Sequence, residues 1–210
     1  MRLSEHGLLG TFYAAMRRPV PPAGRGYLRF GWLLLLLLAA QVISGVLLAV
    51  YYRPTPELAS KSVAYIMRSV RWGWLIRGIH HWASFFVLAL AGLQLVRIVA
   101  TGAYQGVRRP RWTLGLLLLL ALVGLAISGD LLPWDADAYW TARALLAEVE
   151  RMPWLGAGLA NVLRGSADVG ADTLSRAFVL HVLLLPALVL LLVGVNLWML
   201  ERRARGEVRQ

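Results

Sequence analysis

The stretch GWLIRGIHHWASFFVLALAGLQLVRIVATGAY, residues 73–104, combines two adjacent histidines with an apolar run long enough to cross a bilayer. Ionisable and metal-ligating side chains are rare inside membrane spans, where they usually mark functional sites. His80 and His81 are two of only four histidines in the 210-residue chain. Metal chemistry that depends on histidine is therefore expected to involve this segment.

The composition is that of an integral membrane protein. Hydrophobic residues make up 59% of the sequence, well above the share in a soluble domain. The chain has no cysteine, which excludes disulfides, thiolate metal sites and covalently attached c-type haem within it. The net charge of +11 comes from arginines next to the predicted spans, so we expect no nucleic-acid partner.

Four apolar segments predict an all-α membrane protein built as a four-helix bundle. The expected spans cover residues 30–52, 75–100, 112–131 and 177–200, within one domain of residues 30–210. Residues 1–29 precede them as an arm without a signal-peptide pattern. Its apolar residues recur at helical spacing and predict a short amphipathic helix on the membrane surface.

The arginines also predict the orientation, since basic residues gather on the cytoplasmic side. The N-terminal arm, the second connection and the C-terminal tail are rich in arginine, so we place them and both termini on the cytoplasmic n-side. The first connection is basic as well, but the third is acidic, and both are expected on the opposite p-side. The expected location is a bacterial-type cytoplasmic membrane.

The third connection, residues 132–176, is too long for a simple hairpin. Its segment ARALLAEVERM, residues 142–152, has an amphipathic pattern that predicts one or two short helices at the p-side surface. These helices would form a lid or a docking platform, or they would be solvated helices with no function of their own.

Histidines and glycines lie at matching depths on different spans. The fourth span carries His181 at the depth expected for His80 on the second, and two such histidines can bind a haem iron from opposite faces. The first and third spans each carry two glycines fourteen residues apart, about 21 Å along a helix: Gly31 with Gly45, and Gly115 with Gly129. A single glycine in a span is usually a packing contact, but the matched pairs predict two stacked cavities.

Ten short motifs occur in an order and spacing that resemble one known family. They are VPP (20–22), YYRP (51–54), YIM (65–67), GWLIR (73–77), TG (101–102), LPWD (132–135), YW (139–140), LRGSADVG (163–170), TLSR (173–176) and LH (180–181). From Val20 to Met199 the chain resembles the N-terminal four-helix domain of cytochrome b, in the short, split form called cytochrome b6.

The resemblance implies a p-side haem b with His80 and His181 as the axial ligands of its iron. Gly45 and Gly129 would flank this haem, and Arg77 would pair with one of its propionates. The same resemblance implies a quinol pocket shaped by four residues: Tyr139, Gly165, Ser166 and Gly170.

We expect His81 to lie at the rim of the site, because consecutive helical residues point about 100° apart and both cannot face one iron. His6, the remaining histidine, belongs to the N-terminal arm.

At the n-side the resemblance breaks down. The family's n-side haem ligands map onto Gln94 and Asn196, or onto Val195 if the register of the fourth span shifts by one, and none of these is a histidine. The residue that carries an additional covalent haem in cytochrome b6 falls on Arg29. We therefore predict one haem b per chain and no covalent haem.

The n-side cavity has several possible contents. Gly31, Gly115 and Arg97, a candidate propionate partner, are still present. The cavity would be empty, or would hold a quinone, a lipid or a haem with atypical ligands. Alternatively, the amides of Gln94 and Asn196 would hydrogen-bond across the helices.

The resemblance implies a b-type cytochrome subunit of a quinol-oxidising respiratory bc/bf-like complex. Such a complex passes electrons from quinol to a cytochrome c or plastocyanin-like acceptor. The implied partners are a Rieske iron–sulfur protein, a separate subunit IV-like C-terminal half of cytochrome b, a c-type cytochrome subunit and lipid, in a dimeric complex. Without an n-side haem, a complete two-site quinone cycle is in doubt. The alternative is a non-catalytic membrane scaffold with a structural haem.

Overall fold

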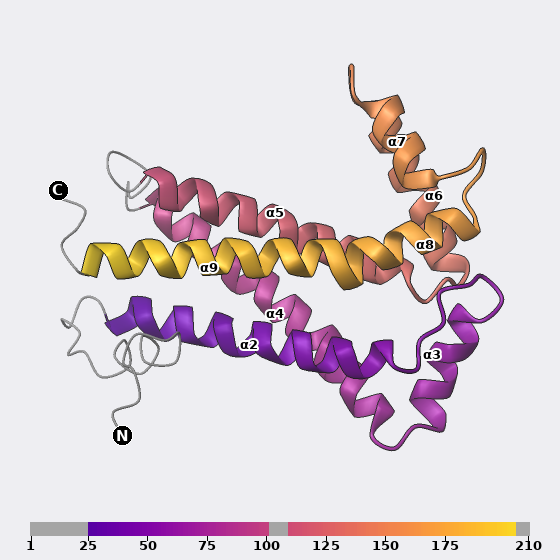
Figure 1. Cartoon of the computed structure of the whole chain (residues 1–210), viewed down its shortest axis with the longest axis horizontal. Coiled ribbons are helices and arrows are strands. Elements are labelled where there is room, and N and C mark those ends of the chain that lie inside the picture. Colours follow the sequence, from indigo (N-terminus) through magenta and orange to yellow (C-terminus); the bar gives the residue numbers. More distant parts are fainter. Residues whose placement is uncertain (1–24, 101–108, 205–210) are drawn as a thin grey trace, which may run out of the picture.

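Four long helices form the molecule (Figure 1). The computed structural model describes residues 25–100 and 109–204, and within these ranges it contains helices and no strand. The long helices are α2 (Arg25–Ala49), α4 (Gly73–Ala100), α5 (Arg109–Leu131) and a fourth that ends as α9 (Leu185–Ala204). All four are long and apolar enough to cross a membrane. The predicted all-helical, four-span fold is confirmed, whereas most of the N-terminal arm lies outside the described residues.

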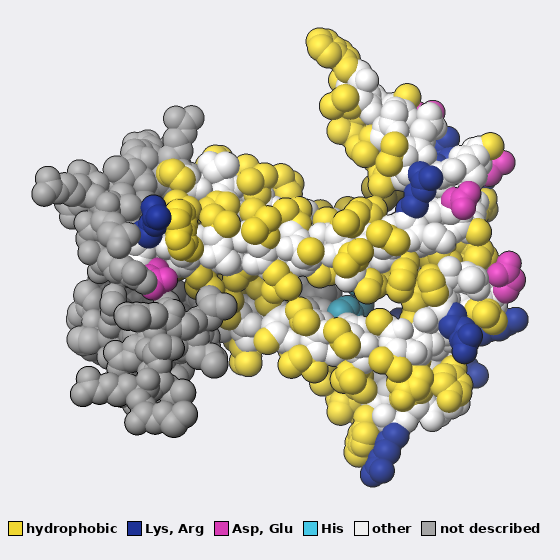
Figure 2. Space-filling view, in the orientation of Figure 1, with side chains coloured by type: hydrophobic (Ala, Val, Ile, Leu, Met, Phe, Trp, Pro, Cys, Tyr) yellow, Lys and Arg dark blue, Asp and Glu magenta, His cyan; other side chains and the backbone are white. Residues whose placement is uncertain are grey.

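The helices pack through their small and aliphatic side chains. Helix α4 lies along α2 and α5, while α9 lies along α5. A cluster of buried residues joins α4, α5 and α9 at mid-depth: Val87, Ala121, Leu122, Val189 and Leu192. Most of the remaining apolar surface of the spans faces outward (Figure 2), as expected where lipid or other subunits surround a bundle.

The fourth span is not a regular α-helix. It begins as α8 (Ala171–Val179), passes through the π-helical turn η3 (Leu180–Leu184) and continues as α9. In an α-helix the ring of Pro186 would clash with the carbonyl of Val182, and Pro186 has no N–H to donate. The wider π turn, in which the Leu185 N–H donates to the Leu180 carbonyl, relieves this conflict and inserts one extra residue. His181 lies inside this turn.

The connections at the histidine end carry three short helices (Figure 1). Helix α3 (Ala59–Arg68) lies in the first connection, where the sequence had not indicated a helix. The third connection holds α6 (Ala136–Glu150) and α7 (Gly156–Arg164), and α7 projects away from the bundle. The Asp135 side chain caps α6 by accepting a hydrogen bond from the Ala138 N–H at 2.9 Å.

Tyr52 ties the two connections at this end together. Helix α2 ends at Ala49, earlier than expected, and Tyr52 turns back toward the bundle. Its hydroxyl donates a 2.6 Å hydrogen bond to the carbonyl of Leu132, and its ring stacks on Phe178 at 5.7 Å. Burial raises the pKa of Tyr52, so the hydroxyl keeps the proton that it donates. We call this end of the bundle the p-side end and the opposite end the n-side end, after the predicted orientation.

Candidate functional site

His80 of α4 and His181 of η3 face each other inside the p-side end of the bundle. Their ring centroids are 6.1 Å apart, with the ring planes inclined at 71°. Both side chains are only partly exposed. The predicted juxtaposition of the two histidines is therefore present in the structure.

Helix α2 holds His80 in place. The Ser44 hydroxyl donates to the Ala40 carbonyl at 2.6 Å, and its oxygen lies 3.0 Å from Nδ1 of His80. The Gln41 amide donates to the backbone carbonyl of His80 at 2.8 Å. A Cβ atom on Gly45 would lie 3.1 Å from Cε1 of His80, so the absence of a side chain at Gly45 admits the imidazole.

Helix α5 holds His181 in the same way. The Ser128 hydroxyl donates to the Gly124 carbonyl at 2.7 Å, and its oxygen lies 3.2 Å from Nδ1 of His181. The Leu125 carbonyl lies 2.9 Å from the same nitrogen. A Cβ atom on Gly129 would lie only 2.7 Å from Cε1 of His181, closer than real Cβ atoms approach other atoms.

We assign the ring proton of each histidine from these hydrogen bonds. A carbonyl can only accept, so the contact with Leu125 requires a proton on Nδ1 of His181. Ser44 and Ser128 have already given their single hydroxyl protons to carbonyls, so each oxygen accepts from the facing Nδ1–H. Nε2 of a neutral imidazole then has a free lone pair, which is the form that binds a metal.

The two serines repeat a sequence pattern that our sequence analysis missed. The tripeptide Ile-Ser-Gly occurs at residues 43–45 in α2 and again at residues 127–129 in α5. In each copy the serine binds the Nδ1 of a histidine and the glycine makes room for its ring. The paired glycines indicated the cavity, but only the repeated tripeptide could have indicated the serines.

The geometry fits a haem bound by both histidines. Two metal–nitrogen bonds of about 2 Å each, plus about 1 Å from each nitrogen to its ring centre, require roughly 6 Å between centroids. The observed separation is 6.1 Å. Among the described residues no three His, Asp or Glu side chains cluster as a metal site. A haem iron takes its other ligands from the porphyrin, so two protein ligands suffice.

Removing the serine hydroxyls tests their positioning role. Ser44→Ala takes away the only hydrogen-bond partner of the His80 imidazole among the described residues, whereas in Ser128→Ala the His181 ring keeps the Leu125 carbonyl. We expect Ser44→Ala to weaken haem retention by about 10-fold and to shift the haem midpoint potential. Ser128→Ala should have a smaller effect on both haem retention and the midpoint potential. Haem retention and redox titration of the two variants measure the difference, and equal effects would contradict these assignments.

His81 and Arg77 lie near this site without contacting the histidine pair. His81 is exposed, and its ring lies edge-on to Trp82 at 5.6 Å. Arg77 lies one helical turn before His80, and its guanidinium donates a hydrogen bond to the sulfur of Met67 at 3.9 Å. Neither position conflicts with the rim role expected of His81 or with the propionate role expected of Arg77.

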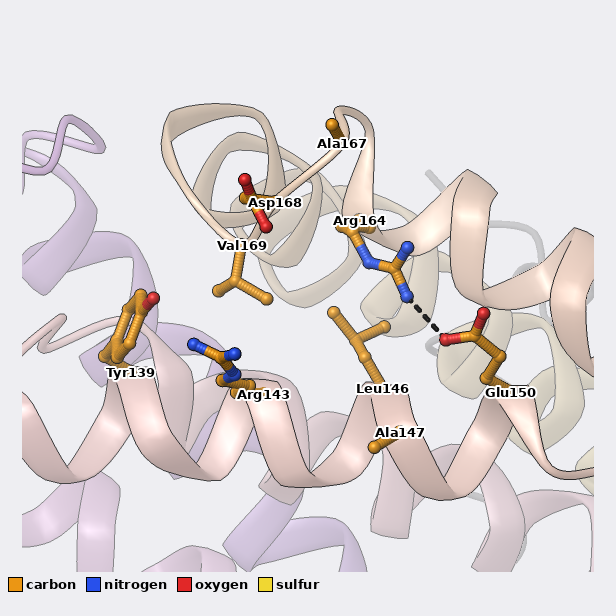
Figure 3. A pocket seen from close by; sticks show the side chains of 9 residues that line it. All are labelled: Tyr139, Arg143, Leu146, Ala147, Glu150, Arg164, Ala167, Asp168 and Val169. Atoms are coloured by element: carbon orange, nitrogen blue, oxygen red, sulfur yellow. Dashed lines mark hydrogen bonds and ion pairs between the residues drawn. The ribbon is translucent and has the colours of Figure 1, made fainter.

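A cavity of about 210 Å³ lies beyond the histidines, between α6 and the segment that follows α7 (Figure 3). Tyr139 lines one end, and the guanidinium of Arg143 extends into the middle. At the other end Arg164 donates to Glu150 at 2.8 Å. Of the four residues predicted for a quinol pocket, Tyr139 is the only one that lines this cavity.

The other three predicted pocket residues shape its wall. Gly165 ends α7 in the left-handed conformation with φ of 86°, and a Cβ there would lie 2.7 Å from Asp172. The Ser166 hydroxyl donates to the Asp168 carbonyl at 2.8 Å, and the Gly170 N–H donates to the Thr173 hydroxyl at 3.2 Å. These contacts fix the fold of residues 167–169, which line the cavity directly.

The n-side end differs from the p-side end in its polar groups. Gln94 and Asn196 are partly exposed, and no hydrogen bond joins them within the described ranges. Cβ atoms on Gly31 and Gly115 would meet nothing within 4 Å. Arg97, which lies one turn after Gln94, has an interaction partner in the structure.

A membrane-spanning four-helix bundle with inward-facing histidines of this geometry is typical of b-type haem proteins. The profile of the family described as Cytochrome b/b6/petB matches residues 16–204. The chain is 35% identical over 175 residues to the menaquinol:cytochrome c reductase cytochrome b subunit of Geobacillus thermodenitrificans, covering 83% of this chain and 78% of that one. The chain belongs to the cytochrome b family.

A solved structure of a hyperthermophilic respiratory Complex III contains a similar chain. The two superpose with a TM-score of 0.71 at 34% identity, over 83% of this chain and 47% of that one. The chain thus spans about half the length of that relative.

Proposed function

We propose that this chain is the b-type cytochrome subunit of a quinol-oxidising complex and holds one haem b between His80 and His181. The observation that carries the proposal is the pair of imidazoles 6.1 Å apart, each held through Nδ1. Family membership and the likeness to a menaquinol:cytochrome c reductase subunit support the same function.

The residues of the chain supply binding, orientation and exclusion of water. A bound haem b would add the ability to take up and release single electrons, which the stepwise oxidation of a quinol needs. Ser44 and Ser128 keep both Nε2 atoms available, and Gly45 and Gly129 leave room for the rings. The buried cluster at mid-depth closes the site toward the n-side end. Arg77, at the p-side rim, would pair with a propionate.

The cavity beside Tyr139 is our candidate for part of the quinol pocket. The Tyr139 hydroxyl can donate or accept a hydrogen bond, as a quinol hydroxyl requires. Gly165, Ser166 and Gly170 would contribute by holding the neighbouring wall. The cavity of about 210 Å³ is smaller than most ligand pockets, so a partner subunit would complete the pocket.

We infer the partners from the family to which the chain belongs. As in the short, split form that the sequence resembles, a separate subunit IV-like polypeptide would supply the C-terminal half of cytochrome b. A Rieske iron–sulfur protein and a c-type cytochrome would take the electrons onward in a dimeric complex. The arginine distribution supports our proposal that both termini lie on the cytoplasmic side of a bacterial-type membrane.

We further propose that the p-side haem is the only one. Gln94 and Asn196 replace the ligands that an n-side haem would need, and an amide is not among the usual axial ligands of haem iron. The absence of cysteine leaves no residue for a thioether-linked haem.

Reduction by quinol tests the proposed function. In the assembled complex, a menaquinol analogue should reduce the haem of this chain. His81→Ala should behave like the unchanged protein, because the His81 side chain is exposed and its ring lies against Trp82. The measurement is the rise of the reduced haem absorption after rapid mixing. A haem that dithionite reduces but quinol does not would favour the non-catalytic scaffold.

A further inference from the structure

Two amide side chains occupy equivalent places at the n-side end, on the two helices that carry the histidines. Gln94 follows His80 by fourteen residues, which is close to four full turns of an α-helix, so both point to the same face of α4. Asn196 follows His181 by fifteen residues. The π turn η3 absorbs the additional residue, so Asn196 returns to the face of His181.

The arrangement of the Gln94 and Asn196 amides therefore follows from that of the two histidines. Because His80 and His181 face each other at 6.1 Å, Gln94 and Asn196 face the same interior about 21 Å further along the bundle. The extra residue of η3 also removes the choice between Val195 and Asn196, since only Asn196 is in register with His181.

The amide of Asn196 lacks an internal partner. Its Oδ1 atom is buried and accepts no hydrogen bond in the part of the chain that the structure describes. A buried acceptor without a hydrogen bond is unfavourable, because it has lost water and gained no other partner. Gln94 and Asn196 do not bond to each other, so they are not the cross-link that amides in membrane helices often form. A ligand with a hydrogen-bond donor would satisfy Oδ1.

The neighbouring helices leave space at this level. At the p-side end the imidazoles fill the notches at Gly45 and Gly129, whereas the positions of Gly31 and Gly115 are open. The apolar cluster at mid-depth separates the two levels. Apolar side chains on the outer faces of the spans offer a surface for a hydrocarbon tail (Figure 2).

We propose that the n-side end binds the head group of a quinone or quinol between Gln94 and Asn196. A quinol hydroxyl donates to Oδ1 of Asn196, and the amide N–H groups donate to a quinone carbonyl, so one pair of amides can bind both redox forms. The chain provides this head group with hydrogen bonds and with no metal ligand. The proposal extends the proposed function, because it names the n-side ligand of a chain with one haem.

Photolabelling of the purified complex tests this site. An azidoquinone with a short isoprenoid tail should label peptides from α4 and α9 around residues 94 and 196. Gln94→Leu and Asn196→Leu keep similar volumes but lose the amides, and each should reduce this labelling about 10-fold, as expected for one lost hydrogen bond of about 1.4 kcal/mol. Leu197→Met, at an exposed position of α9, serves as the matched control and should label normally.

The same preparations separate this proposal from the proposed function. The haem content and spectrum should stay unchanged in both leucine variants. His80→Ala should lose its haem and still be labelled at the n-side end. Equal labelling in the leucine variants and the control would overturn the quinone site. If either leucine variant lost a second haem, the amides would belong to a haem site and the proposal would be overturned. If excess phospholipid abolished the labelling, the amides would belong to a lipid site, which would overturn it as well.

Discussion

Replacing His80 or His181 by Ala should remove essentially all haem b from the protein. In the proposed site each imidazole would supply one ligand to the iron, and within the described ranges no other histidine faces the 6.1 Å gap. An Ala side chain has no lone pair to offer, and the remaining histidine alone cannot hold the iron from both sides. The measurement is the b-type absorption of the purified complex before and after reduction with dithionite.

His81→Ala is the matched control for this pair of variants. It removes an imidazole from the next residue of the same helix, but that imidazole is exposed and lies against Trp82. Its haem spectrum should equal that of the unchanged protein. If His81→Ala lost the haem while His80→Ala kept it, the axial ligands would have been assigned wrongly.

Gly129→Ala should weaken haem binding by about 10-fold or more, although Ala normally stabilises a helix. The new Cβ would lie 2.7 Å from Cε1 of His181, so the ring must leave the position in which Ser128 and Leu125 hold it. Overpacking of this kind costs about 1–3 kcal/mol. Gly45→Ala, with a contact of 3.1 Å to His80, should have a smaller effect. Haem occupancy after dialysis against apomyoglobin measures the loss.

Gly115→Ala tests whether the effect of an added methyl group on haem binding depends on its position along α5. It lies on the same helix fourteen residues before Gly129, and its new Cβ would meet nothing within 4 Å. We expect unchanged haem occupancy and a helix stabilised by up to about 1 kcal/mol. Thermal unfolding recorded on both variants separates loss of haem from loss of fold. Equal haem occupancy in the two variants would show that the notch at Gly129 does not position His181.

The sequence was sufficient to predict the four membrane spans and the histidine pair. Runs of about twenty apolar residues require a helix in lipid, because the backbone must satisfy its own hydrogen bonds, and the observed spans follow these runs closely. His80 and His181 were placed at one depth by counting residues from the ends of the spans. The structure brings them to a distance that suits one iron.

Other features depended on contacts that the sequence does not display. Ser44 and Ser128 look like ordinary small residues in a span, and their role appears only when the facing histidine is in place. The π turn could have been suspected from Pro186, but the proline does not say where the extra residue is inserted. Helix α3 was missed because its short segment is more polar than the spans and carries no span-length signal.

The predicted quinol pocket shows a third limit of prediction from sequence. Tyr139 lines a cavity, but Gly165, Ser166 and Gly170 hold the adjoining chain through turns and backbone hydrogen bonds. A motif can mark a local backbone shape without saying which of its atoms face the ligand. The cavity itself is formed by α6 and the segment after α7, which helix α7 separates in the sequence and which meet only in the folded chain (Figure 3).

The haem content of the purified chain is the most direct test of a single haem bound by His80 and His181. A pyridine haemochrome assay, with protein determined by amino-acid analysis, should give one b-type haem per chain and a spectrum lost in His80→Ala. Two firmly bound b-type haems per chain would contradict the account, because Gln94 and Asn196 would then lie in a working haem site.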